Sequence, residues 1–211
     1  MHIQCALIQI FKNWGIPRWI KVDNGRPFGD PQRQTVPVLA LWLTALGIQV
    51  IFNRPRIPQD NAKVERSQRV LSNWTEWHKC ANAAELQHRL WKEADFHNMT
   101  YPVSRLDGKT RREAFPGLSR SDIEFNPENF ELQRALDLLA QGHWQRVVSI
   151  NGQIDFWGIR IRVGKHYARQ FMSIKLDPKQ NLWMIFNPQG AIIKVVETSI
   201  TDQKLWKLDL S

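Results

Sequence analysis

Residues 15–28 read Gly15-Ile16-Pro17-Arg18-Trp19-Ile20-Lys21-Val22-Asp23-Asn24-Gly25-Arg26-Pro27-Phe28, a short apolar run that ends in a turn. The run from Trp19 to Val22 predicts a buried strand, and Asp23-Asn24-Gly25 predicts the turn after it. Upstream, apolar residues up to Trp14 recur at helical spacing, and Gly15 predicts the end of that helix. Taken alone, Asp23 is an ordinary turn residue.

The chain after this turn predicts a buried helix and a second strand. Thr35 is expected to cap the helix, with Pro37 near its first turn and Gly47 at its end. Because the helix is apolar on almost every side, we expect it to be buried. Ile48–Phe52 then predicts the strand.

A second segment reads Pro58-Gln59-Asp60-Asn61-Ala62-Lys63-Val64-Glu65-Arg66. It opens a predicted helix over about 61–78, with Asp60 or Asn61 as the N-cap. On its own, Glu65 is a helix-surface glutamate that can pair with Arg69 four residues on.

In combination and in this order, the two segments resemble the catalytic core of retroviral-type integrases and bacterial insertion-sequence transposases. The resemblance covers Met1 to about Phe115 and includes the run HNMTYPVSRLDGKTRREAF at residues 97–115. It implies a ribonuclease-H-like fold with a catalytic triad of two aspartates and a glutamate. Asp23 matches the second aspartate of that family, and Glu65 matches the glutamate.

The chain also departs from the family pattern. Ala62 stands where the family usually has glycine, and the 41 residues between Asp23 and Glu65 are more than is usual. Residues 1–22 hold no Asp or Glu, so the first aspartate and the first three strands have no counterpart. We therefore expect an N-terminally truncated core that performs no strand transfer alone. Three explanations stay open: a decayed or truncated reading frame, which we favour, half of a split transposase, or a shortened product that inhibits the full-length enzyme.

The resemblance implies a metal-dependent reaction at the two carboxylates. Cleavage and strand transfer at phosphodiesters need charge stabilisation on the attacking and the leaving oxygen, which two ions about 3.5–4 Å apart provide. Hard carboxylate oxygens suit Mg²⁺, or Mn²⁺ in its place. Asp23 and Glu65 are thus the predicted catalytic residues and metal ligands for two ions in an assembled site.

The remainder of the chain predicts a linker and a β-rich module. Residues 83–97 and 130–141 have helical patterns, and the stretch between them, with four basic residues in 101–117, is typical of an irregular linker. From residue 142, five strand-length runs alternate with turn signals such as Asn151-Gly152. The runs are 147–150, 154–163, 171–176, 182–186 and 191–196. The predicted fold is α/β: a partial ribonuclease-H-like integrase core (1–100), a helical linker (101–141) and a small SH3-like β-barrel (142–198).

Charge indicates a polyanionic partner. With 29 Lys and Arg against 20 Asp and Glu, the net charge is +9 and the pI is about 9.9. Residues 142–194 contain eight basic residues and two acidic ones. The predicted DNA contacts are Arg54, Arg56, Lys63, Arg66 and Arg69 around Glu65, and Arg160, Arg162, Lys165 and Arg169 in the β-rich module. For Trp157 and Trp183 we favour a place in the core over base stacking.

The predicted partners are transposon-end and target DNA and further transposase subunits, with no small-molecule substrate.

No run approaches the roughly 18–20 apolar residues of a membrane span, and Cys5 and Cys80 fit neither a disulfide framework nor a zinc site. We expect a cytoplasmic, nucleoid-associated protein. The rival functions are a non-enzymatic DNA-binding remnant, a dominant-negative regulator, and a basic structural protein whose interactions do not weaken with salt.

Overall fold

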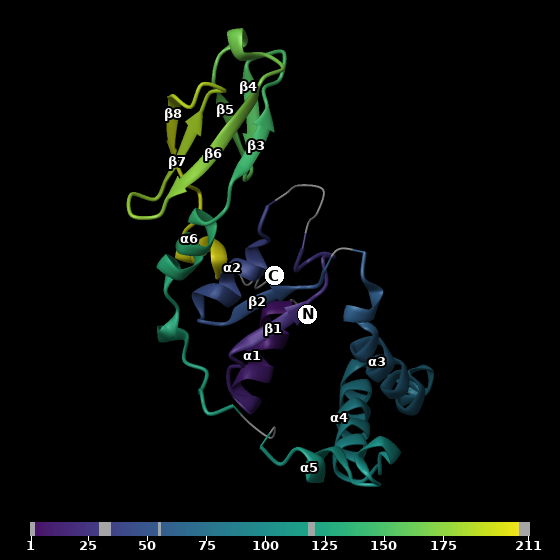
Figure 1. Ribbon diagram of the computed structural model, residues 1–211. Helices are drawn as coiled ribbons and strands as arrows, with labels where there is room; N and C mark the ends of the chain where they lie inside the picture. Colours follow the sequence, from purple (N-terminus) through teal and green to yellow (C-terminus); the bar gives the residue numbers. More distant parts are fainter. Residues whose placement is uncertain (1–2, 30–34, 55, 118–120, 207–211) are drawn as a thin grey trace. The chain divides into compact units, whose positions relative to one another are not determined.

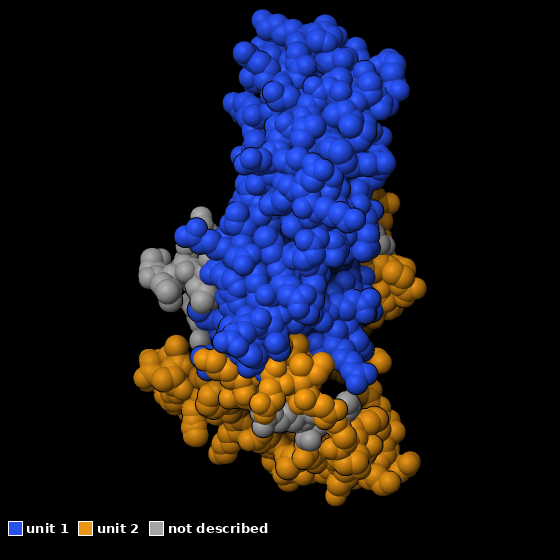
Figure 2. All heavy atoms as spheres, turned by 90° about the vertical axis from the view of Figure 1, so that its left-hand side faces the viewer, with its two compact units in different colours: residues 1–9, 17–52, 125–211 blue, residues 10–16, 53–124 orange. Residues whose placement is uncertain are grey.

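The computed structural model describes residues 3–29, 35–54, 56–117 and 121–206. They form a mixed α/β structure with small sheets (Figure 1). The chain divides into two compact units, coloured separately in Figure 2. Unit 1 comprises residues 1–9, 17–52 and 125–211, and unit 2 comprises residues 10–16 and 53–124.

Unit 1 is built on a parallel strand pair and a buried helix. Strand β1 (Trp19–Val22) pairs with β2 (Gln49–Phe52) in parallel, and α2 (Val38–Ala45) connects them. Six of the eight α2 residues are buried, which confirms the prediction of a helix enclosed on nearly all sides. The predicted cap was wrong: Pro37 is the N-cap and makes no side-chain hydrogen bond, so the helix begins later than Thr35 predicts.

Two further helices cover α2. Helix α6 (Leu132–Ala140) packs against α2 through its apolar face and is preceded by the 3₁₀ turn η4 (Pro127–Asn129). Helix α7 (Asp202–Leu205) also packs against α2. The Trp42 and Trp206 rings are nearly perpendicular, with 5.7 Å between ring centroids. The last helix, α7, therefore packs in the same part of unit 1 as α2, which connects β1 and β2.

The C-terminal part of unit 1 is antiparallel β structure. Its strands are β3 (Trp144–Val147), β4 (Gln153–Phe156), β5 (Ile159–Arg162), β6 (Phe171–Asp177), β7 (Leu182–Phe186) and β8 (Ile192–Glu197), with the 3₁₀ turn η5 (Lys165–Tyr167) before β6. Four of them form a sheet in the order β3-β6-β7-β8, and β4 pairs with β5. Trp183 is fully buried between Trp144 and Phe156, which confirms its predicted place in the core. Among the described residues these strands form two sheets and no closed barrel is seen.

Three strand predictions needed correction. The run 154–163 is two strands, because Trp157 and Gly158 form a tight turn with φ of 52° and 73°. Positive φ at both central residues is the geometry of hairpin turns that match strand twist. The Asn151-Gly152 turn forms, but its flanking strands β3 and β4 belong to different sheets. The first strand is Trp144–Val147 in place of 147–150.

Unit 2 is helical. It holds the end of α1 (Ile3–Trp14), η1 (Pro58–Asp60), α3 (Ala62–Thr75), η2 (Trp77–Lys79), α4 (Ala83–Met99), η3 (Ser104–Leu106) and α5 (Arg111–Ala114). Helix α3 packs on α4, and α4 packs on α5. The α3 helix ends earlier than predicted, since Glu76 adopts a left-handed conformation. The predicted irregular segment contains η3 and α5, and a capping box between Thr110 and Glu113 starts α5.

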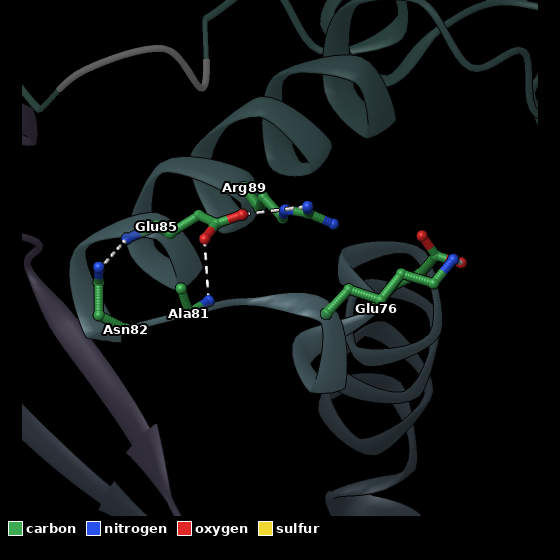
Figure 3. A network of polar contacts seen from close by, with 6 residues as sticks. Glu76, Ala81, Asn82, Glu85 and Arg89 are labelled. Carbon is green, nitrogen blue, oxygen red and sulfur yellow. Dashed lines mark hydrogen bonds and ion pairs between the residues drawn. The ribbon is translucent and has the colours of Figure 1, made fainter.

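A polar network fixes the start of α4 (Figure 3). The Asn82 side chain accepts a 2.9 Å hydrogen bond from the Glu85 amide, and the Glu85 carboxylate accepts from Ala81 N at 2.9 Å and from Arg89 Nη2 at 3.1 Å. These bonds satisfy amides that a helix start leaves without partners. The hydrogen bond from Ala81, and then Arg89, lower the pKa of Glu85. The network sets where α4 begins. The C-terminal end of α4 carries His97, which belongs to the site described next.

Candidate nucleic-acid interface

Unit 2 contains a cavity of about 440 Å³ whose charged lining is entirely cationic. Its walls come from η1, α3, the end of α4, η3 and the start of α5. The lining residues are Gln59, Ala62, Lys63, Arg66, Ser67, Val70, His97, Arg105 and Arg111. We call this cavity the basic groove. Four Lys or Arg side chains with no carboxylate among them favour an anionic ligand.

One wall of the basic groove is a single face of α3. Lys63, Arg66, Ser67 and Val70 are spaced at i, i+3, i+4 and i+7, so the helix presents them together. The sequence predicted a DNA-contact role for Lys63 and Arg66, and the structure places both in one lining. Arg69 lies on α3 outside that lining.

The opposite wall depends on a contact between α4 and α5. Arg111 Nη1 donates a 2.7 Å hydrogen bond to the backbone carbonyl of His97 in the last turn of α4. Carbonyls at a helix end lack intrahelical partners and carry partial negative charge, so a guanidinium is stabilised there. This bond holds Arg111 and His97 at the same side of the basic groove.

The cationic side chains of the basic groove repel one another. Burial, and then the neighbouring Arg105, lower the pKa of Arg111. Burial, and then Arg111, lower the pKa of His97. Within the described part of the chain, the ion pairs involve other residues, and Lys63, Arg66 and Arg105 have none. A bound anion would relieve this repulsion.

A second cavity of about 520 Å³ adjoins the basic groove and shares Lys63, Arg105 and Arg111 with it. Its other lining residues are Trp14, Asp95, Asn98, Met99, Leu106, Arg112 and Phe115. We call it the aromatic pocket. It differs from the basic groove in having large apolar side chains and one carboxylate.

The two predicted metal ligands lie in different units. Asp23 directly follows β1 in unit 1, is exposed, and accepts a hydrogen bond from Gly25 N at 3.1 Å. Glu65 lies near the start of α3 in unit 2 and is also exposed, with Asn61 Nδ2 3.5 Å from its Oε1. Each carboxylate is exposed to solvent, and its hard oxygens suit Mg²⁺. Over the described ranges, no group of three or more potential ligand side chains occurs, and the shared metal site stays a prediction.

Other predicted DNA contacts have partners or lie elsewhere. Arg54 forms a two-pronged ion pair with Asp60, through Nη2–Oδ1 at 2.8 Å and Nε–Oδ2 at 3.1 Å. This pairing raises the pKa of Arg54 and neutralises its charge locally. Arg56 is exposed with a φ of 60° and does not line the basic groove.

The predicted contacts of the β-rich module are exposed in unit 1. Arg160 and Arg162 alternate with inward residues of β5, as predicted, but Arg160 forms an ion pair with Asp155 at 2.9 Å. Lys165 lies in η5, and Arg169 follows it with a φ of 66°. The structure thus leaves Arg162, Lys165 and Arg169 as the stronger candidates for phosphate contacts there.

Sequence reasoning missed half of the basic groove. Arg105 and Arg111 lie in the segment interpreted as a linker, and His97 was one of six scattered histidines. The available signal was the concentration of four basic residues in 101–117. Periodicity identifies a helix face, but it does not show which distant loop packs against that face.

Comparison with known proteins gives a distant structural similarity. No protein-family model matches the sequence. A similar solved structure is that of the simian T-cell lymphotropic virus intasome in complex with PP2A regulatory subunit B56 gamma, at 15% identity and a TM-score of 0.39. The match covers 94% of this chain and 63% of that one, so this chain spans less than two thirds of its length. At this level the similarity does not establish a shared fold or activity.

No helix in the described ranges is both long enough and apolar enough to span a membrane.

Proposed function

We propose that this chain binds DNA as part of an integrase-type transposase, and that the basic groove holds the sugar–phosphate backbone. The observation that carries the proposal is the α3 face bearing Lys63 and Arg66, opposed by Arg105 and Arg111 with no carboxylate in the lining. Phosphate contacts from Lys and Arg supply most sequence-independent affinity and set the register of a protein on DNA. The resemblance of the segment around Glu65 to transposase cores points to DNA over other polyanions.

The proposed reaction of the assembled enzyme is phosphodiester cleavage and strand transfer. Asp23 and Glu65 would hold two Mg²⁺ or Mn²⁺ ions, which when bound stabilise charge on the attacking and leaving oxygens. The resemblance assigns only these two of the three carboxylates to residues of this chain. We therefore propose that the chain alone binds DNA without joining strands.

The proposal is tested by the salt dependence of binding to a labelled duplex. We expect the double variant Lys63→Gln/Arg66→Gln to bind more weakly and to reduce the slope of log K against log salt by roughly 2, since each lost phosphate contact contributes about 0.9. The matched control is Lys92→Gln/Lys109→Gln, which removes two exposed charges of unit 2 that lie outside the basic groove. Equal losses in both variants would show diffuse attraction by net charge and contradict the groove as the binding site.

A nicking assay in Mg²⁺ or Mn²⁺ separates the enzyme from its rival, a non-enzymatic DNA-binding module or inhibitor. Nicking that disappears in Glu65→Ala would mean that another group completes the metal site. No nicking by either protein, with salt-sensitive binding intact, would support the rival. One observation favours the rival as a second candidate: the basic groove is complete within unit 2 and needs no residue near Asp23.

A further inference from the structure

The aromatic pocket exposes large apolar side chains beside the basic groove. Trp14 is 55% exposed, Met99 is 57% exposed and Phe115 is 50% exposed. Exposed aromatic side chains grouped around a cavity mark a binding site more often than a bare surface does. At about 520 Å³, the pocket lies in the range of small-ligand sites.

The two aromatic side chains are held by backbone structure on either side of the pocket. Trp14 O accepts a 2.8 Å hydrogen bond from Ser121 N, and next to it Ile16 N donates to Ile123 O at 2.7 Å. Phe115 closes α5, where its amide donates to Arg111 O at 2.9 Å. The backbone of both residues is therefore held within unit 2, which lowers the entropy cost of bringing their side chains to a planar group.

Charge decides which part of a ligand each cavity takes. Each cavity is lined by four Lys or Arg side chains, but the aromatic pocket also holds the Asp95 carboxylate, which repels a phosphate, whereas the basic groove has no carboxylate. The same carboxylate and the Asn98 amide suit the N–H groups of a nucleobase edge. Lys63, Arg105 and Arg111 line both cavities, so a phosphate on them is adjacent to the aromatic pocket.

We propose that the basic groove and the aromatic pocket together bind one nucleotide whose base is unstacked from its neighbours. The phosphate lies in the basic groove, and the base stacks on Trp14 or Phe115 with its edge toward Asp95 and Asn98. The inference rests on the proposed function, since it places the DNA backbone in the basic groove. It adds that unit 2 selects DNA with an unpaired base, such as a bulge or a strand end.

The test compares three short labelled duplexes that differ at one position: fully paired, with one extra unpaired adenosine, and with an abasic residue in place of that adenosine. We expect the adenosine bulge to bind about fivefold or more tightly than the other two, because stacking of a base on an aromatic side chain contributes at least this factor. The abasic duplex controls for backbone flexibility at the bulge. Equal affinity for the adenosine and the abasic bulge would overturn the proposal.

Variants assign the preference to the pocket. Phe115→Ala together with Trp14→Ala is expected to abolish it while affinity for the paired duplex stays within about twofold; Phe115→Tyr, which keeps a stacking ring, should retain it. Circular dichroism and the melting temperature show whether each variant is folded, and Phe115→Ala alone serves if the double variant is not. A preference that survives loss of the rings contradicts the inference. If the unaltered chain showed no salt-sensitive DNA binding at all, this would instead contradict the proposed function.

Discussion

At the scale of single residues, His97 couples the basic groove to pH. His97 lines the cavity, and the pKa of its ring is lowered first by burial and then by Arg111, so the neutral form is favoured at pH 7. A bound phosphate favours the protonated form and raises this pKa, so that a proton is taken up on binding. Without a ligand, protonation is resisted, and the contribution of the neutral ring to stability is lost as pH falls from about 6.5 through the lower folded pKa.

We therefore expect affinity for DNA to increase as pH is lowered through this range at constant ionic strength. His97→Gln keeps a polar side chain of similar reach and should flatten the profile. His88→Gln is the control, since His88 lies on the same helix and does not line the basic groove. An unchanged profile in His97→Gln, measured by fluorescence anisotropy, would show that some other group is responsible.

At the scale of elements, the α3–α4 connection positions one wall of the basic groove. The cap of α4 is Asn82, which bonds the Glu85 amide. Losing a side-chain N-cap typically costs about 0.5–2 kcal/mol of stability. Because Asp95, His97 and Asn98 lie near the other end of this helix, a frayed start changes stability without removing any proposed contact.

Asn82→Ala is accordingly expected to lower the free energy of unfolding by about 1 kcal/mol, while Asn82→Asp, which keeps an accepting oxygen, loses much less. Urea titrations followed by circular dichroism measure the difference. Asn73→Ala, at an exposed position within α3, should stay within about 0.5 kcal/mol of the parent. A change of equal size at both positions would mean that the cap hydrogen bond is not what stabilises α4.

Elements also show what sequence can predict. Strands β1 and β7 appear at their predicted residues, because each is a short apolar run between strong turn signals. The predicted burial of β1 was wrong, since Val22 is buried but Trp19 is exposed. The β3 strand was missed, since pairing with β6, not its own apolar content, selects Trp144–Val147. The turn at Trp157 was not predicted, because tryptophan is not a residue that favours turns or positive φ. In the site, Lys63 and Arg66 were predicted because they flank Glu65, whereas Arg105 and Arg111 depended on tertiary packing.

At the scale of the whole molecule, the β1–β2 pair leaves apolar side chains exposed to solvent. In the part of the chain that is described, it has two parallel strands, each with one neighbour. Parallel sheets are normally covered on both faces, yet Trp19, Ile51 and Phe52 are exposed. Open strand edges next to apolar side chains are templates for pairing with another chain.

We expect the purified protein to self-associate as its concentration rises, and Ile51→Lys to reduce this association by placing a charge on the edge strand. Sedimentation velocity over a range of concentrations measures the effect. Ile150→Lys is the control because Ile150 is exposed outside this sheet. A parent protein that stays monomeric at every concentration would rule out the open edge as an association site.

The Arg111 bond to the end of α4 has a thermodynamic consequence for unit 2. Lys63 and Arg66 come from one helix, and Arg105 and Arg111 from a segment some 40 residues later, so folding brings together charges that the extended chain keeps apart. Their mutual repulsion opposes folding, and a polyanion that binds only the folded form compensates for it in proportion to the logarithm of its concentration. The melting temperature is thus expected to rise with the concentration of the proposed DNA ligand, because occupancy of the basic groove and structural order in unit 2 rise together.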